Sequence, residues 1–484
     1  MATVTISPAR SRPFVEFLLL LLAVSVGLGG YALTYLNRTE ELPANIWWHA
    51  LFLVVFALVA HLGVRYLAPH ADPVILPLAV GLTGIGLAMI FRLDMSFRLL
   101  PERAGEITGI KQLIMVVVGL VCAAIVLVMV RDHRLLRRYT YTAMVISVIL
   151  LLLPMVPGLG VEHFGARIWI RLGPFSLQPA EFVKVFLAIF FAGYLVSNRD
   201  NLAIGGPKIL GLRLPRARDL GPILMVWAVA VGILVMQRDL GTSLLFFGLF
   251  VAMIYIATNR VSWLVIGALI FTPAAVGAYF MFSHVRHRFN VWLHAFSPAV
   301  YDLEYGGSYQ VVQGQFGMAS GGLFGTGWGR GYPQLVPFSQ SDFILASLGE
   351  ELGFTGLMAI LLMYLILIER GMRAAIGVRD GFGKLLAAGI SFSLALQLFV
   401  VLGGITRLIP LTGLTAPFLA QGGSSMVASW ILVALLLRVS DAARRPATPV
   451  EPPAQALEAA QESPASEGGG DAGKNERRRQ EVQR

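Results

Sequence analysis

Charged side chains are scarce in this sequence. Asp, Glu, Lys and Arg together make up 14% of the 484 residues, whereas 56% are hydrophobic. A soluble globular protein carries about a quarter charged residues, so a large soluble core is excluded. Apolar runs of about 20 residues recur along the whole chain instead, and each can cross a bilayer core about 30 Å thick. The composition therefore indicates a polytopic helical membrane protein.

Cysteine and nucleotide-binding signatures are nearly absent. Cys122 is the only cysteine and lies inside an apolar run, so no disulfide can form within one chain. The Gly-rich stretch at 306–331 lacks the Lys-Ser/Thr ending of a nucleotide P-loop. The formal net charge of +10 does not indicate nucleic-acid binding, because basic loops in a membrane protein mostly fix its orientation.

We predict an all-α fold of about twelve transmembrane helices. The first apolar run follows Arg10 and Arg12 and is too long for the core of a signal peptide, so it should be an uncleaved anchor helix. The expected spans lie near residues 14–36, 45–67, 73–93, 112–130, 139–157, 178–197, 220–237, 240–257, 261–283, 342–368, 384–406 and 422–438.

Basic residues predict the orientation of these spans. Lys and Arg gather before the first span, after the fourth, sixth and tenth, and after the last. The span count puts all of these on one side, which should be the cytoplasm, so both termini are expected there. Two predicted outer loops, 91–111 and 284–288, also carry basic residues, and Arg286 and Arg288 could contact lipid headgroups or phosphate. The long loop 306–341 is then extracytoplasmic.

The end of the chain has a different composition. Residues 441–484 are rich in Pro, Ala, Glu and Gly and have almost no large apolar side chains. Such a segment cannot bury enough surface to fold, so we expect a disordered cytoplasmic tail.

A long Gly-rich loop interrupts the apolar helices and ends on a lone acid, Asp342. A long loop between membrane helices is costly unless it has a function. We therefore expect it to roof an outward-facing cavity with Asp342 at its mouth. Its glycines, among them Gly322 and Gly325, would let the backbone approach a ligand closely. A merely flexible loop is the alternative.

Two adjacent acids, Glu350 and Glu351, follow inside the next predicted span. At about 1.5 Å per residue they would lie roughly 12 to 14 Å deeper than Asp342. Buried acids must be protonated, paired or facing water. The helical phase lets at most one of them, Glu350, share the cavity with Asp342, and the other should brace a neighbouring helix.

Charged residues also stand at the expected outer ends of two other spans. Glu181 and Lys184 are three residues apart on one helix face and can pair. Lys184 could instead join Arg167, in the preceding loop, in binding an anionic group such as a diphosphate. Asp239 lies in a tight turn before the eighth span, as a helix N-cap or as a partner of Arg238.

Two prolines and a glycine pair break the helical pattern within residues 409–426, where Ser424 and Ser425 add hydroxyl groups. Irregular backbone at membrane depth survives only against protein or a wet cavity. The segment is therefore either part of a binding site or a re-entrant bend that packs small residues.

These five stretches, in order, resemble the SEDS family (shape, elongation, division and sporulation), the RodA and FtsW type. They read GARIWI with QPAE and Lys184, QRDLGT, SYQVVQGQFGMASGGLFGTGWGRG, SDFILASLGEELG and LTGLTAPFLAQGGSSM. The resemblance is closest to the elongation type of high-GC bacteria. It covers about residues 73–440 and implies a catalytic core of ten spans there, with residues 1–72 as additional N-terminal anchor helices.

The resemblance implies a peptidoglycan glycosyltransferase of the bacterial plasma membrane. Such enzymes polymerise lipid II, a disaccharide-pentapeptide on undecaprenyl diphosphate, for cell-wall elongation and cell shape. A class B penicillin-binding protein is the implied partner, and a divalent cation (Mg or Mn) is a possible cofactor. Asp342 matches the family's essential Asp and would be the general base. The residues expected to contact substrate are Arg167, Glu181, Lys184, Asp239, Gln310, Gly322, Gly325, Glu350, Ser424 and Ser425.

The chain departs from the family pattern at a few positions. Since no His precedes Asp342, a His there cannot be needed for chemistry in this chain. The departures are Ala180 in place of Ser, Arg238 in place of Pro, Gln340-Ser341 in place of His-Thr, and Ala420-Gln421 in place of Ser-Tyr.

Two other functions remain open at this point. A lipid II flippase would also use an amphipathic cavity with charges, but it would make no polymer. An ion-coupled transporter would use Glu350 and Glu351 inside the membrane. The transporter is disfavoured because the densest motifs lie on the expected outer face and no internal repeat is evident.

Overall fold

The computed structural model describes residues 13–100, 107–163, 166–173, 175–199, 208–209, 212–213, 217–303 and 306–446. A helix stands at each of the twelve predicted span positions within these residues, and eleven helices are long and apolar enough to cross a membrane. The twelve are α1 (Pro13–Thr39), α2 (Ile46–Leu67), α3 (Ile75–Phe97), α4 (Gly109–Met129), α5 (Thr140–Leu152), α6 (Ala180–Ser197), α8 (Ala217–Met236), α9 (Leu240–Thr258), α10 (Ser262–Met281), α14 (Ile344–Gly377), α15 (Gly381–Ile405) and α16 (Gly423–Arg444).

The predicted polytopic helical fold therefore agrees with the structure. The predicted tail begins too early, because residues 441–444 form the last turn of α16. The rest of that prediction, for residues 447–484, lies outside the described residues.

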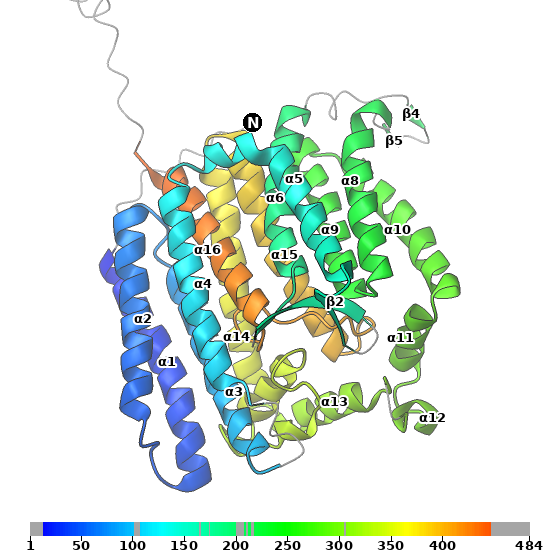
Figure 1. The fold of residues 1–484 in the computed structure, drawn as a ribbon. Helices are drawn as coiled ribbons and strands as arrows, with labels where there is room; N and C mark the ends of the chain where they lie inside the picture. The colour runs from blue at the N-terminus through cyan, green and yellow to red at the C-terminus, as the bar shows by residue number, and fades with distance from the viewer. Residues whose placement is uncertain are drawn as a thin grey trace, which may run out of the picture. The chain divides into compact units, whose positions relative to one another are not determined.

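The helices pack side by side as a bundle, with α1 along α3, α4 along α16, α5 along α6 and α14 along α15 (Figure 1). Helices α3, α6, α15 and α16 are mostly buried and form its centre, whereas α10 lies at the edge. A Cβ added to Gly27 would lie 3.0 Å from Gly84 Cα, so α1 approaches α3 closely. Small residues permit such close helix packing in membranes.

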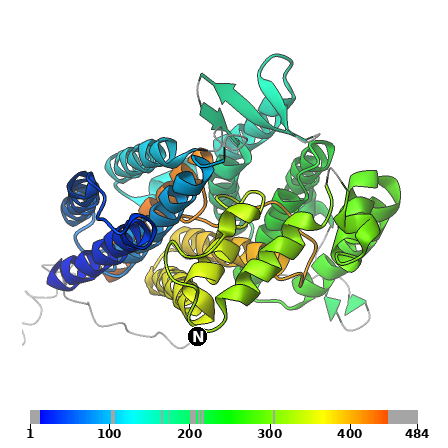
Figure 2. The same cartoon turned by 90° about the horizontal axis from the view of Figure 1, so that it is seen from below.

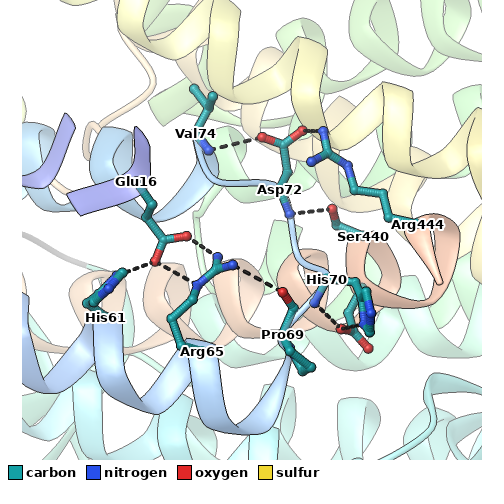
Figure 3. A network of polar contacts seen from close by, with 10 residues as sticks. Glu16, His61, Arg65, Pro69, His70, Asp72, Val74, Ser440 and Arg444 are labelled. Atoms are coloured by element: carbon teal, nitrogen blue, oxygen red, sulfur yellow. Dashed lines mark hydrogen bonds and ion pairs between the residues drawn. The ribbon is translucent and has the colours of Figure 1, made fainter. Parts of the chain in front are cut away.

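A polar network closes one end of the bundle, here called the Arg444 end (Figure 3). Asp72, just before α3, forms an ion pair with Arg444. Glu16 of α1 is buried and bonds to His61 at 2.7 Å and to Arg65, both on α2. Buried charges need such partners, so the network ties the two N-terminal helices together and fixes the start of α3 to the end of α16.

The all-α prediction omitted two small sheets. Strands β1 (Gly160–His163), β2 (Ala166–Leu172) and β3 (Phe175–Leu177) form an antiparallel sheet in that order, and β4 (Lys208–Ile209) pairs with β5 (Leu212–Arg213). In β2, Arg167 and Arg171 alternate with Ile168 and Ile170, and Ile170 is buried. Alternation with period two is the signal of a half-buried strand.

The prediction of one structureless Gly-rich loop at 306–341 is wrong. The helix α13 (Tyr309–Gly321) occupies the first part, after α11 (Ser283–Leu293) and α12 (Pro298–Tyr301). Figure 2 looks at this end of the bundle, with α13 (yellow-green) in front, and we call it the α13 end. Gly314 lets α13 pack closely on α14, because a Cβ there would lie 2.5 Å from the Phe343 ring.

The predicted span that carries the two glutamates is not one continuous helix. Gly353 has φ 69° and ψ −173°, so it breaks α14 and makes residues 344–352 a separate helical segment. Glu351 pairs with Arg92, which lies near the end of α3, and Glu350 accepts the Tyr332 N–H at 2.6 Å. Both acids therefore contact residues at the α13 end, and their depth below Asp342 stays a prediction. Bracing of a neighbouring helix by Glu351 is confirmed.

Candidate functional site

Asp342 lies in the turn before α14, half-buried and next to the fully buried Phe343. A Cβ added to Gly413 would lie 3.6 Å from Asp342 Oδ2, so the irregular segment between α15 and α16 passes beside the carboxylate. Burial raises the pKa of Asp342 to about 6, against the charge of Arg288 and a hydrogen bond from Ser341. Such a carboxylate is largely ionised at neutral pH and basic enough to accept a proton.

The charge of Arg288, in α11, acts on two carboxylates. Its Nη1 donates to Leu411 O at 2.7 Å, and its charge acts on both Asp239 and Asp342. Burial lowers the pKa of Arg288, and the two carboxylates raise it again. The sequence predicts a contact of Arg288 with lipid headgroups or phosphate, which stays a prediction, and it does not indicate the effect on the two carboxylates. The available signal was a basic residue in a predicted outer loop, where the positive-inside rule disfavours it.

Asp239 is the N-cap of α9, which confirms one of its two expected roles. Its Oδ1 accepts the Thr242 N–H at 2.9 Å, and its Oδ2 accepts from Thr242 Oγ1 at 2.7 Å and from Gln178 Nε2 at 3.4 Å. The cation that acts on Asp239 is Arg288, and the charge of Glu181 also reaches it. The residues of the QRDLGT turn therefore join the surroundings of Asp342 through Arg288.

Glu181 and Lys184 form the predicted ion pair, with Lys184 Nζ 2.6 Å from Glu181 Oε2 and both side chains buried. Lys184 Nζ also donates to Gln397 Oε1 at 3.0 Å, and Gln397 Nε2 donates to Thr415 O at 2.9 Å. A chain of hydrogen bonds thus connects α6 through α15 to the irregular segment 406–422, which passes Asp342. Gln397 and Thr415 were not singled out from the sequence.

Ser424 and Ser425 are both hydrogen-bonded within the protein. Ser424 Oγ accepts the Gln178 N–H at 3.1 Å, and Ser425 Oγ accepts from Thr415 Oγ1 at 3.0 Å. The segment before them also accepts a hydrogen bond at Pro417 O from Tyr364. These contacts confirm a bend packed against protein, and its backbone groups are satisfied there as the membrane requires. Asp342, Asp239, Glu181, Lys184, Ser424 and Ser425 thus belong to one connected polar region.

Two of the predicted site residues, Arg167 and Gln310, contact parts of the protein other than the surroundings of Asp342. Arg167 of β2 is 60% exposed at its side chain and pairs with Glu162 at 2.9 Å. Gln310 of α13 donates to Pro337 O at 3.2 Å. Neither contact connects these side chains to Asp342, so their roles toward substrate stay predictions.

Gly322 and Gly325 pack against the break in α14. A Cβ on Gly325 would lie 2.2 Å from Glu351 O, and Gly322 O accepts the Phe354 N–H at 2.9 Å. Here the close approach that glycine permits is to the protein's own backbone. With Glu350, these glycines form the attachment of the Gly-rich loop to α14, and their contact with substrate stays a prediction.

Two more basic side chains lie near Arg288. Burial, and after it the charges of Arg238 and Arg288, lower the pKa of His284 in α11. Arg238 is exposed and has φ 63°, whereas a Pro fixes φ near −65°. The turn before Asp239 therefore has a backbone that the Pro of the SEDS pattern could not adopt. We call Arg238, His284 and Arg288 the basic cluster. The sequence pointed to Arg238 in two ways, as a possible partner of Asp239 and as a departure from the Pro of the SEDS pattern.

Comparison with known proteins agrees with these motifs. The family model described as cell cycle protein, covering FtsW, RodA and SpoVE, matches residues 73–445. The chain is 45% identical over 441 residues to peptidoglycan glycosyltransferase RodA of Mycobacterium tuberculosis (strain ATCC 25618 / H37Rv), covering 91% of this chain and 92% of that protein. It is 43% identical over 453 residues to the protein of the same name from Mycobacterium leprae, covering 92% and 94%.

Solved structures share the fold. A chain from a peptidoglycan synthase complex that coordinates polymerization and crosslinking gives a TM-score of 0.52 at 24% identity, covering 81% of this chain and 97% of that one. The Rod shape determining protein RodA of Thermus thermophilus gives 0.52 at 22% identity, covering 76% and 96%. The polytopic helical fold is thus confirmed, and the chain belongs to the FtsW, RodA and SpoVE family of cell cycle proteins.

Proposed function

We propose that this chain is a peptidoglycan glycosyltransferase that polymerises lipid II into β-1,4-linked glycan strands for cell-wall elongation and cell shape. The mycobacterial relatives, covered over 92% and 94% of their lengths, carry this activity in their names. The structural observation that carries the proposal is Asp342, half-buried, with a pKa raised to about 6. It stands beside Arg288 and the irregular segment 406–422.

In this proposal Asp342 is the general base. It takes the proton from the acceptor sugar hydroxyl, whose oxygen attacks the anomeric carbon of the donor. The electron pair of the broken carbon–oxygen bond leaves with the lipid diphosphate. One displacement inverts the α-linked donor to a β bond, so it needs one base and not a pair of carboxylates.

The basic cluster is the proposed site of the leaving diphosphate. Negative charge grows on that group in the transition state, and guanidinium groups stabilise it by charge-assisted hydrogen bonds. The charge of Arg288 acts on Asp342. The same guanidinium can therefore favour the ionised form of the base and stabilise the leaving diphosphate. Lys184 is already bound by Glu181 and Gln397, and its expected contact with the diphosphate stays a prediction.

The described residues do not fit a metal centre built by the protein. Among them no three His, Cys, Asp or Glu side chains come together, and Arg288 supplies the positive charge between Asp239 and Asp342. We therefore derive no step through a metal. The expected need for Mg or Mn stays a proposal, in which the ion would bind with the substrate phosphates, as Mg²⁺ usually does.

The remaining parts of the proposal concern location and partner. In the proposal the Arg444 end faces the cytoplasm, both termini are cytoplasmic, and Asp342 faces outward across the bacterial plasma membrane. Lipid II then keeps its chain in the bilayer while its sugars reach the site. A class B penicillin-binding protein would crosslink the new strands, as the family resemblance implies.

The test is polymerisation by purified protein. We incubate the full chain in detergent with lipid II, with and without its transpeptidase partner, and separate the products for glycan ladders. Wild type should give ladders, and Asp342→Asn should give at least about a hundredfold less product, because removal of a general base costs about 10² to 10⁴ in rate.

Asp302→Asn is the matched control, since this carboxylate is exposed just after α12. It should polymerise like wild type. Ladders from Asp342→Asn at a near wild-type rate would refute the assignment of the base. Lipid II that crosses the bilayer of sealed vesicles without any ladder would instead favour a flippase.

A further inference from the structure

The end of the N-terminal helix α1 is bonded to the Gly-rich loop. Asn37 Nδ2 donates to Trp328 O at 2.7 Å, and Arg38 Nε donates to Gly329 O at 2.9 Å. In return, Arg330 Nη2 donates to Asn37 Oδ1 at 3.1 Å. Three hydrogen bonds therefore join the last turns of α1 to a loop almost three hundred residues later in the chain.

The shapes of the two segments fit one another closely. A Cβ on Gly329, which has φ 80°, would lie 2.9 Å from Thr34 O. A Cβ on Gly30 would lie 2.9 Å from the Trp328 ring. Thr34 is buried there. Both sides of the contact thus depend on glycine, which indicates a fixed register between helix and loop.

The same loop holds the first segment of α14 by its two glutamates. Gly329 N–H donates to Glu351 Oε2 at 2.9 Å, and Tyr332 N–H donates to Glu350 Oε1 at 2.6 Å. Arg92 of α3 pairs with Glu351 and donates to the loop at a further carbonyl. Each charged side chain in this contact has an ion-pair or hydrogen-bond partner, so the contact can be rigid. We call this contact, between the end of α1, residues 328–332 and the two glutamates, the joint.

The joint is connected to Asp342 by one short helix. Residues 344–352 form a single helical segment that ends at the Gly353 break, and Asp342 stands in the turn at its other end. Ser347 Oγ donates to Ser339 O at 3.0 Å, which ties the segment to the backbone before Asp342. A shift of the loop would therefore move the start of α14 and, with it, the carboxylate.

We propose that Asn37 and Arg38 of α1 are positioning residues for Asp342. They fix residues 328–331, which fix the two glutamates and hence the helical segment that carries the base. The helix α1 precedes residue 73, where the family match begins, so this support is an addition to the family core. The proposal rests on the proposed function, because it assigns α1 a role in that reaction.

The test compares kcat with KM for lipid II polymerisation by the full chain with its partner. The double variant N37A/R38A should lower kcat about 10- to 100-fold, since small displacements of a reacting group have effects of this size. KM for lipid II should stay within about twofold, because the basic cluster is untouched. Arg38→Lys keeps a donor for Gly329 O and should restore most of the activity that Arg38→Met loses.

Two controls separate positioning from loss of the fold. Thr39 lies at the exposed end of the same helix, and its hydroxyl bonds to Tyr35 O and Glu41 O nearby in the chain. Thr39→Ala should therefore leave kcat and Tm unchanged. In N37A/R38A, hydrogen exchange should speed up at Gly327 and Gly329, whose amides are bonded to Glu351, while exchange in α15 stays the same.

The outcomes can be told apart. Wild-type kcat in N37A/R38A, or equal losses in Arg38→Lys and Arg38→Met, would overturn this proposal and leave the proposed function standing. A fall in kcat that only parallels a fall in Tm would overturn it too. If wild type with its partner makes no glycan ladder, the proposed function fails, and this proposal fails with it.

Discussion

At the scale of single residues, Asp342 experiences opposing effects on its proton affinity. Burial raises its pKa to about 6, whereas the charge of Arg288 favours the ionised form. Asp342 itself could be expected from the sequence, because a lone acid ending a Gly-rich stretch is unusual. Arg288 could not be placed, because its contacts depend on how α11 packs over the segment 406–422.

The pH profile of the reaction reports this balance. The ionised form of Asp342 is the base, so kcat/KM should fall as pH drops through about 6 and be roughly tenfold lower at pH 5 than at pH 7.5. In Arg288→Met the missing positive charge should move the midpoint to higher pH. The measurement is lipid II polymerisation between pH 4.5 and 8.5.

Arg286→Met is the control for this shift. Arg286 is exposed on the same helix and donates to Phe280 O, so its removal should leave the midpoint in place. A midpoint near 4 in wild type, or one that Arg288→Met leaves unchanged, would contradict the arrangement.

Asp342→Asn should not lower Tm at neutral pH, because the folded protein solvates the ionised carboxylate poorly.

At the scale of elements, the long apolar helices could be predicted and the breaks between them could not. Each span needs only about 20 apolar residues, a property local to the sequence. The break at Gly353 instead depends on residues 322–327, which hydrogen-bond to the backbone on both sides of it. A single Gly inside an apolar run gives no sign of these loop partners, so the sequence predicts one continuous span where the structure has two helical segments.

Gly353→Ala tests the break. Its φ of 69° disfavours any Cβ, and a Cβ there would lie 2.2 Å from Gly325 N. We expect a loss of at least about 1 to 3 kcal/mol, seen as a lower Tm in detergent, together with a loss of polymerisation. Gly277→Ala in α10 is the matched control, because a Cβ there meets no atom within 4 Å. Equal Tm values for the two variants would mean that the break is not required.

At the scale of the whole molecule, the distribution of charge distinguishes the two ends. Asp380, between α14 and α15, bonds to His133 at 2.6 Å and lies near Arg134, and Arg370 lies 3.7 Å from Asp72 at the Arg444 end. Two of the basic residues that opposed the predicted orientation, Arg92 and Arg288, have partners inside the protein at the α13 end. Arg92 pairs with Glu351, and Arg288 faces two carboxylates. Their charge belongs to the protein's interior, so it does not weigh against an outward α13 end.

Cysteine labelling measures this orientation directly. Cys122 is the only cysteine, so Cys122→Ser gives a background without thiols. Ser320→Cys on α13 and Arg379→Cys between α14 and α15 add exposed thiols at the two ends. In right-side-out vesicles a membrane-impermeant maleimide should label Ser320→Cys at once and Arg379→Cys only after permeabilisation. The reverse pattern would place Asp342 in the cytoplasm, where the sugars of a lipid II molecule already moved outward could not reach it, and the proposed polymerisation would then be excluded.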